Sequence, residues 1–250
     1  MKIAKLSGKP EIFHTIQGEG LSAGLPSIFL RLSQCNLHCI WCDTDYTWNW
    51  EGTRFKHEKD STPGYKKFRR SEQILECSTS ELAGAISAYD CTNLVITGGE
   101  PLLQMEGLLN LTKTLREKGR IRHIEVETNG TIVPGKEFDN TVDQYNVSPK
   151  LSNSNNSASI RIKADAIKFF ASSPKASFKF VIGSPADLDE VESLTENFSI
   201  PPEKVILMPL GTTVKALDER SRWLADICRD RGFGFSDRMH IRIFGNRRGV

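Results

Sequence analysis

Six short, β-prone stretches alternate with helix-like stretches along this chain, and this alternation constrains the fold more than any other feature. The predicted strands are 27–32, 93–97, 123–130, 145–150, 177–182 and 204–209. The predicted helices are 79–89, 105–119, 164–170, 185–197 and 215–231. Strands that alternate with helices build a parallel sheet covered by helices, so we expect an α/β fold. A last apolar stretch, 240–244, is predicted to be a further strand.

The composition predicts one folded unit, residues 1–250, with a sizeable core, because 38% of the residues are hydrophobic. No apolar run approaches ~18 residues, the length that a membrane span needs. The N-terminus also lacks the apolar region of a signal peptide. We therefore expect a cytoplasmic protein that does not bind a membrane. The 33 basic and 31 acidic residues nearly cancel, and nothing in the charge predicts a nucleic-acid partner.

Three cysteines, Cys35, Cys39 and Cys42, are spaced C-x3-C-x2-C directly after the first predicted strand. They therefore lie on a loop at the carboxyl end of a strand, where barrel enzymes place their chemistry. Three thiolates leave one iron of a four-iron cluster open to an outside ligand, whereas a closed zinc site takes four ligands. A zinc site completed by His38 is the alternative. The clustering favours metal or cluster binding in a reducing compartment over a disulfide framework.

Further motifs lie before and after the cysteines. Residues 15–20 read TIQGEG, and residues 97–101 read TGGEP at the end of the second predicted strand. Glycines without a Cβ allow the backbone to approach a ligand closely. The later motifs are ETNG at 127–130, SPK at 148–150 and the tail HIRIFGNRRGV at 240–250.

Together these motifs resemble the radical S-adenosylmethionine (SAM) superfamily, and within it the 7-carboxy-7-deazaguanine synthase family. The resemblance extends from Ile16 to Val250 and implies an incomplete, open (β/α)6 barrel. It also implies a carbon–nitrogen lyase that converts 6-carboxy-5,6,7,8-tetrahydropterin to 7-carboxy-7-deazaguanine and ammonia, for queuosine or other 7-deazapurine biosynthesis. In that family one electron from a [4Fe-4S] cluster cleaves SAM, and the adenosyl radical removes a hydrogen atom from C6 before the ring contracts.

The resemblance assigns roles to individual residues. The metal ligands are Cys35, Cys39 and Cys42 for the [4Fe-4S] cluster and Thr44 for Mg²⁺. The substrate contacts are Ile16, Gln17, Gly18, Glu19, Arg31, Thr97 and Val250. The SAM contacts are Trp41, Cys42, Asp43, Gly99, Glu127, Ser148, Pro149 and Lys150, although a structural hydrogen bond is an alternative role for Glu127. No side chain is expected to act as a nucleophile.

Four segments outside the predicted strands and helices carry expectations of their own. The loop 11–24 is expected to bind substrate, and the tail 245–250 to cover the site. The segment 51–70 is read as an exposed insertion whose basic run, 66–70, is a solvated loop. The Ser- and Asn-rich segment 153–159 is predicted to be mobile. The family also implies a homodimer that receives electrons from a flavodoxin or a ferredoxin.

Two rival functions share some of these features. An activating enzyme that makes a glycyl radical on a partner protein has the cysteine motif and the glycine turn. Such an enzyme, however, would have no use for Gln17, Glu19 and Arg31, the set of side chains that suits a pterin. A zinc- or cluster-binding RNA protein would use the basic run 66–70. The chain departs from the family in the long segment 51–70 and at Asp237, where a proline is expected.

Overall fold

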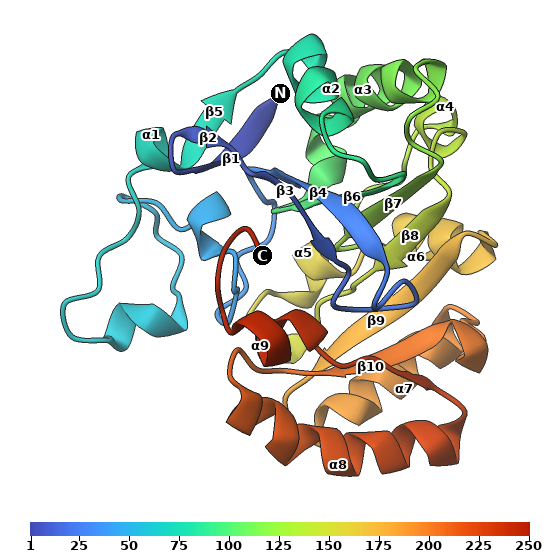
Figure 1. The fold of residues 1–250 in the computed structure, drawn as a ribbon. Coiled ribbons are helices and arrows are strands. Elements are labelled where there is room, and N and C mark those ends of the chain that lie inside the picture. The colour runs from blue at the N-terminus through green and yellow to red at the C-terminus, as the bar shows by residue number, and fades with distance from the viewer.

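The computed structural model describes residues 1–250 and contains one mixed sheet of eleven strands (Figure 1). The strands are β1 (Lys2–Leu6), β2 (Lys9–Pro10), β3 (Ile12–Ile16), β4 (Pro26–Leu32), β5 (Ile74–Glu76), β6 (Asn93–Gly98), β7 (His123–Thr128), β8 (Gln144–Val147), β9 (Ala176–Ile182), β10 (Val205–Pro209) and β11 (Gly234–Phe235). They lie in the order β11-β10-β9-β8-β7-β6-β4-β1-β2, with β3 paired to β4 and β5 to β1. The sheet is therefore open.

The six predicted strands, β4 and β6 to β10, form the parallel part of the sheet together with the short β11. Their registers align functional candidates at the carboxyl ends: Arg31 of β4 lies opposite Thr97 of β6. Glu127 of β7 lies opposite Asn146 of β8. The α/β fold with a parallel sheet is thus confirmed, and the sheet edge that carries the motifs is the edge at which parallel strands end together.

Nine α-helices accompany the strands. They are α1 (Arg70–Gln73), α2 (Thr79–Ser87), α3 (Met105–Glu117), α4 (Lys136–Asp139), α5 (Ala158–Arg161), α6 (Ala164–Ser172), α7 (Asp187–Asn197), α8 (Val214–Arg231) and α9 (Met239–Phe244). The local sequence explains their ends. Ser78 and Glu81 form a reciprocal capping box at the start of α2. Gly232, with a φ of 70°, ends α8 in the left-handed conformation that glycine adopts without strain.

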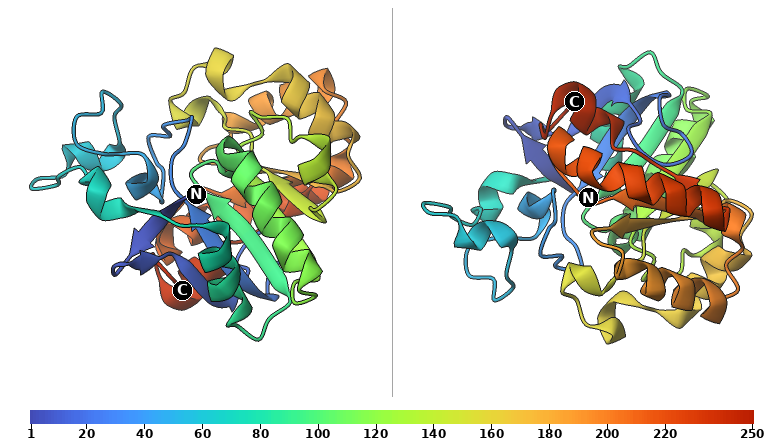
Figure 2. Two further views of the ribbon diagram at one scale, coloured as in Figure 1. Left: turned by 90° about the horizontal axis from the view of Figure 1, so that it is seen from above. Right: turned by 90° about the horizontal axis from the view of Figure 1, so that it is seen from below.

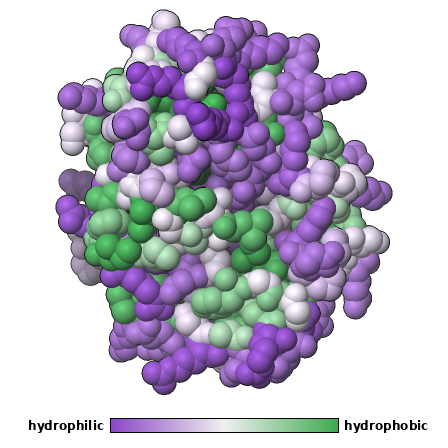
Figure 3. Space-filling model, turned by 45° about the vertical axis from the view of Figure 1, so that its right-hand side comes forward, coloured by the Kyte–Doolittle hydropathy of each residue, from purple (hydrophilic) through white to green (hydrophobic).

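The long helices cover the outer side of the curved sheet, and segment 51–70 projects away from it (Figure 2). The hydrophobic core lies between sheet and helices as one cluster of 36 buried residues. Phe178 and Phe180 of β9, for example, are fully buried. The exposed apolar side chains form separate patches between hydrophilic surfaces (Figure 3). No helix combines the length and the apolar character that crossing a bilayer needs.

The prediction of a strand at 240–244 is wrong, because these residues belong to α9. The helix is held by backbone hydrogen bonds from Arg242 to Arg238 and from Gly245 to Ile241. Only Ile241 within it is buried. A run of five residues with three apolar positions fits both helical and strand periods, so the pattern alone does not decide between them.

Candidate active site

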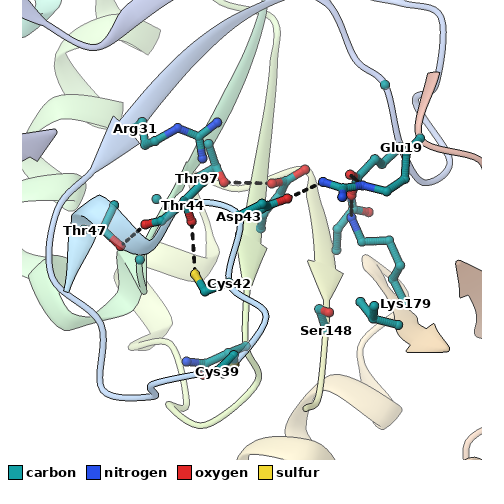
Figure 4. Close-up of a pocket in the computed structure, with 18 of the residues that line it drawn as sticks. Glu19, Arg31, Cys39, Cys42, Asp43, Thr44, Thr47, Thr97, Ser148 and Lys179 are labelled. Carbon is teal, nitrogen blue, oxygen red and sulfur yellow. Dashed lines mark hydrogen bonds and ion pairs between the residues drawn. The ribbon is translucent and has the colours of Figure 1, made fainter. Parts of the chain in front are cut away.

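A cavity of about 230 Å³ opens at the carboxyl ends of the parallel strands. All but one of the predicted site residues line it: Ile16, Gln17, Gly18, Glu19, Arg31, Cys35, Cys39, Trp41, Cys42, Asp43, Thr44, Thr97, Gly99, Glu127, Ser148, Lys150 and Val250. The exception is Pro149, which is buried beside Gly130 instead. Figure 4 shows the cysteine loop on one side of the cavity, with Glu19 and Lys179 on the other.

The three motif cysteines are free thiols that border this cavity. Burial raises the pKa of all three, for Cys42 to about 12, so bound iron is needed to hold them as thiolates. No three His, Cys, Asp or Glu side chains converge closely enough to hold a single metal ion. Sulfurs on one zinc ion lie about 3.8 Å apart, given Zn–S bonds of ~2.3 Å. The three thiols are therefore not gathered as a single-ion site requires, whereas a four-iron cluster takes each thiolate on a different iron.

The turn after β6 packs directly against the cysteine loop. A Cβ at Gly99 would lie 2.1 Å from the carbonyl oxygen of Gln34, so only glycine fits there. The next residue, Glu100, is fully buried and accepts hydrogen bonds from the Thr128 hydroxyl (2.8 Å) and the backbone N–H of Asn129 (2.7 Å). The GGEP motif therefore joins the exits of β6 and β7 beneath the cavity.

Arg31 enters the cavity from β4 with part of its guanidinium free. Its Nε donates to Glu11 over 3.0 Å, and its two terminal amino groups donate to no protein atom. Glu11 is almost fully buried and also accepts from the Tyr46 hydroxyl (3.0 Å) and from Arg248 (2.6 Å). A guanidinium held at Nε presents its outer edge, which is suited to a ligand carboxylate.

Glu19 lies across the cavity in a cluster of charged side chains. Lys179 donates to one carboxylate oxygen (2.5 Å), and Arg238 donates to the other (2.9 Å). Burial opposes the charged form, but Lys179 and Arg238 outweigh it and hold the pKa of Glu19 well below its usual range. Arg238 also pairs with Asp43, next to Cys42. One arginine thus connects the loop 11–24 to the cysteine loop.

Gln17 and Gly18 shape the backbone that carries Glu19. The Gln17 amide donates to Glu125 (2.7 Å) and Glu127 (3.2 Å), and its oxygen accepts from the Glu19 backbone N–H (3.2 Å). A Cβ at Gly18 would lie 2.3 Å from Nδ1 of His240, so glycine lets the two segments meet. Glu127 also accepts a hydrogen bond from the Thr97 hydroxyl (2.7 Å). A structural hydrogen bond of this kind is the role that the sequence offered as an alternative to SAM binding.

The sequence predictions missed three basic residues that line the cavity, Lys179, Arg238 and His240. Lys179 carried a signal, because a lysine in the middle of an otherwise apolar, fully buried strand needs a partner. Arg238 lies just before the tail motif and His240 is its first residue, but neither was given a role. Their placement depends on α9, which the sequence pattern did not predict.

Two segments that we expected to be exposed or mobile contact the cysteine loop. Within 51–70, which is otherwise largely exposed, His57 is buried with Nε2 2.9 Å from the carbonyl oxygen of Cys42. Phe55 stacks on His38, with ring centroids 3.5 Å apart. The segment 153–159, which we predicted to be mobile, also contacts this loop. Asn156 is buried there and hydrogen-bonded to the cysteine loop.

Comparison with known proteins first defines the class: a family model described as a 4Fe-4S single cluster domain matches residues 16–165. The 7-carboxy-7-deazaguanine synthase of Pyrobaculum aerophilum is 38% identical over 96% of this chain and 95% of its own. That of Rhodopirellula baltica is 34% identical over 96% and 87%. The crystal structure of QueE from Escherichia coli matches with a TM-score of 0.65 and 27% identity over 92% of each chain. The chain belongs to the 7-carboxy-7-deazaguanine synthase family, as the motifs predicted.

Proposed function

We propose that this chain is a radical SAM lyase that converts 6-carboxy-5,6,7,8-tetrahydropterin to 7-carboxy-7-deazaguanine and ammonia. The observation that carries the proposal is the meeting of three free thiols, Arg31 and Glu19 around one cavity. The family relationship supports the same reaction. The parallel strands β4 and β6 to β10, with their helices outside, are then an incomplete, open (β/α)6 barrel that holds the cavity at its carboxyl end.

The protein's part in this reaction is to bind and orient. When bound, the [4Fe-4S] cluster on Cys35, Cys39 and Cys42 and the SAM on its open iron supply the one-electron chemistry that removes hydrogen from C6. Arg31 offers its free guanidinium edge to the substrate carboxylate. Glu19, held ionised, accepts from the N–H groups of the pterin's amino-pyrimidinone edge. A fixed pose is what aims one C–H bond at the reacting atom and excludes water.

The remaining binding residues divide between the two ligands. Ile16, Gln17, Gly18, Thr97 and Val250 complete the substrate side. Trp41, Cys42, Asp43, Gly99, Glu127, Ser148, Pro149 and Lys150 form the SAM side. The Lys150 ammonium lies 2.8 Å from the Ser148 hydroxyl and 5.9 Å from the Trp41 ring, and it is positioned to attract the SAM carboxylate.

A Mg²⁺ ion on the Thr44 hydroxyl would help to seat the substrate carboxylate. Mg²⁺ keeps several waters and substrate oxygens, so one protein ligand is sufficient. The enzyme acts as a homodimer in a reducing, cytoplasmic compartment, consistent with six free cysteines. It receives its electrons from a flavodoxin or a ferredoxin.

Anaerobic reconstitution with iron and sulfide, followed by incubation with SAM, reductant and the carboxypterin, tests the reaction. We expect a brown protein with about four irons per chain and a product with the mass and ultraviolet spectrum of 7-carboxy-7-deazaguanine, without net consumption of SAM. Cys42→Ala is the control and should lose both iron and product. A wild-type protein that holds the cluster and cleaves SAM, yet leaves the carboxypterin unchanged, would contradict the proposed substrate.

A further inference from the structure

Each of the three motif sulfurs has one hydrogen-bond partner, and one of these partners comes from a distant segment. Cys35 Sγ accepts from the backbone N–H of Leu37 (3.5 Å), and Cys42 Sγ lies 3.6 Å from the Thr44 hydroxyl. Both partners belong to the cysteine loop. Cys39 Sγ accepts from the side-chain amide of Asn156 (3.4 Å), which is 117 residues further along the chain.

Asn156 lies on a strap, defined here as residues 151–156, that is bound to the cysteine loop at several points. The backbone N–H of Ile40 donates to the carbonyl of Ser154 (3.0 Å), and the Trp41 indole donates to the carbonyl of Asn153 (2.9 Å). Arg161 donates to the carbonyl of Asn156 itself (3.1 Å) and thereby anchors the end of the strap. These contacts fix the position of Asn156 relative to Cys39.

The orientation of the Asn156 amide follows from its other partner. The backbone N–H of His38 lies 3.0 Å from Oδ1 of Asn156. An N–H can only donate, so the amide oxygen must face His38, and the NH₂ group must then face Cys39. The NH₂ group also contacts the carbonyl and hydroxyl of Ser154 (3.3 and 3.2 Å). Asn156 is 8% exposed, so water does not compete freely for the sulfur.

We propose that Asn156 is a positioning residue that raises the reduction potential of the cluster by donating a hydrogen bond to the Cys39 thiolate. This inference rests on the cluster assignment of the proposed function. Reduction transfers one electron from an external low-potential reductant to the cluster, without making or breaking a bond. The added negative charge is shared with the thiolates, so an N–H donor stabilises the reduced state more than the oxidised one. Asn156 therefore makes the electron transfer that precedes SAM cleavage more favourable.

The test is a potentiometric titration of the reconstituted protein, followed by the electron paramagnetic resonance signal of the reduced cluster. Asn156→Leu removes the donor. We expect a roughly tenfold less favourable reduction equilibrium, which is ~59 mV more negative for a one-electron couple. Asn156→Asp keeps an oxygen for the His38 N–H but replaces the donor with a charged acceptor, so its potential should be more negative still. Asn153→Leu is the matched control on the strap, because the Asn153 NH₂ group donates to the Val181 carbonyl (3.0 Å) rather than to a sulfur.

Iron content and the visible spectrum, measured on the same samples, separate the inference from the cluster assignment. A wild-type protein without a cluster would contradict the proposed function. Loaded Asn156 variants with the potential of the wild type would overturn the role of Asn156 alone. Equal shifts in the Asn153 and Asn156 variants, or loss of iron from both Asn156 variants, would show that the strap only holds the loop together and would also overturn it.

Discussion

At Glu19, the cavity keeps a largely buried carboxylate ionised by surrounding it with cations. Lys179 and Arg238 occupy its two oxygens, and His240 lies 3.8 Å away. Burial lowers the pKa of Lys179, but the charges of Glu19 and Glu127 and the hydrogen bond to Glu19 together outweigh that effect, and the pKa of the lysine is raised overall. The pair therefore stays charged together, which a single buried ion would not do. A charged acceptor is thus ready for the N–H groups of a ligand.

The three cysteines outside the motif should not hold iron. Cys77 and Cys228 are buried among core residues, and Cys91 lies 3.4 Å from the carbonyl of Pro26. We expect the triple variant Cys77→Ala, Cys91→Ala, Cys228→Ala to keep about four irons per chain after reconstitution, as measured by a colorimetric iron assay. Loss of iron from this variant while the motif is intact would show that a ligand lies outside the motif.

The Thr44 hydroxyl contacts only Cys42 Sγ, 3.6 Å away, and bonds to no backbone group. Thr44 precedes a short 3₁₀ turn, Asp45–Thr47, but its side chain makes no capping hydrogen bond. Thr44→Val keeps the shape and deletes the oxygen. We expect turnover to fall and to lose its dependence on Mg²⁺, while SAM cleavage without product continues.

Thr47→Val is the matched control, because the Thr47 hydroxyl donates to the backbone carbonyl of Thr44 over 2.8 Å. This variant should keep its response to Mg²⁺. If turnover of Thr44→Val rises with Mg²⁺ as that of the wild type does, the threonine is not a ligand.

At the scale of elements, the sequence predicted the parts that have strong local patterns. The six parallel strands and the long helices were recovered because each is a periodic or continuous apolar segment. The strap was not recognised, since its Ser and Asn residues are ordered by contacts with the distant cysteine loop. The same limit applies to His57, which is buried through its bond to the Cys42 carbonyl. Local pattern cannot reveal a segment whose structure is fixed by another segment.

The C-terminal tail returns to the cavity because Arg248 anchors it. This guanidinium donates to Glu11 (2.6 Å) and to the carbonyl of Lys5 (2.9 Å), and it lies 3.4 Å above the Tyr46 ring. Val250 then lines the cavity. Deletion of Gly249 and Val250 should remove the contact that we propose between the tail and the substrate, and a charged hydrogen bond at that place is worth ~1.5–3 kcal/mol. We expect substrate affinity to fall very roughly ten- to a hundredfold, as measured by calorimetry with the carboxypterin.

A short extension after Val250 should have the same effect by displacing the tail from the cavity. Both variants should keep their iron content and their affinity for SAM, which controls for folding. A protein extended by several residues that binds and turns over the carboxypterin as well as the original would exclude the tail from the site.

At the scale of the whole molecule, a buried polar cluster joins the N-terminal loop to the middle of the sheet. Glu125 of β7 is 1% exposed and accepts from Gln17 of the loop and from Asn146 of β8. Asn146 in turn accepts from Ser177 of β9 over 3.3 Å. Three segments of the sequence therefore meet at Glu125, and β9 joins them through Asn146, so the protonation of this glutamate affects the stability of the fold as a whole.

The protonation of Glu125 should make the stability of the protein depend on pH between about 5 and 7. Burial, and then the charge of Glu127, raise the pKa of Glu125 to about 7. An unfolded glutamate titrates near 4.3, so between these values the folded state binds more protons than the unfolded state. The contribution of Glu125 is therefore fully present below the unfolded pKa and is lost as the pH rises through the folded pKa. At 1.36 kcal/mol per pKa unit, the shift from 4.3 to about 7 makes the ionisation of this group cost up to ~4 kcal/mol at pH 8.

Glu125→Gln removes this ionisation and keeps an oxygen that accepts from Gln17 and Asn146. Because the variant has no charge to bury at this position, its stability relative to the wild type should rise steadily from pH 5 to pH 8. Anaerobic urea unfolding of the cluster-loaded proteins measures this difference. Glu81→Gln is the control of opposite sign, since hydrogen bonds from Ser78 lower the pKa of Glu81. The stability that Glu81 contributes is lost only as the pH falls through its lowered pKa, so that variant should differ from the wild type by a constant amount over the same range. A constant difference for Glu125→Gln as well would mean that Glu125 carries the same charge in the folded and unfolded states across this range, and that the polar cluster does not link folding to pH.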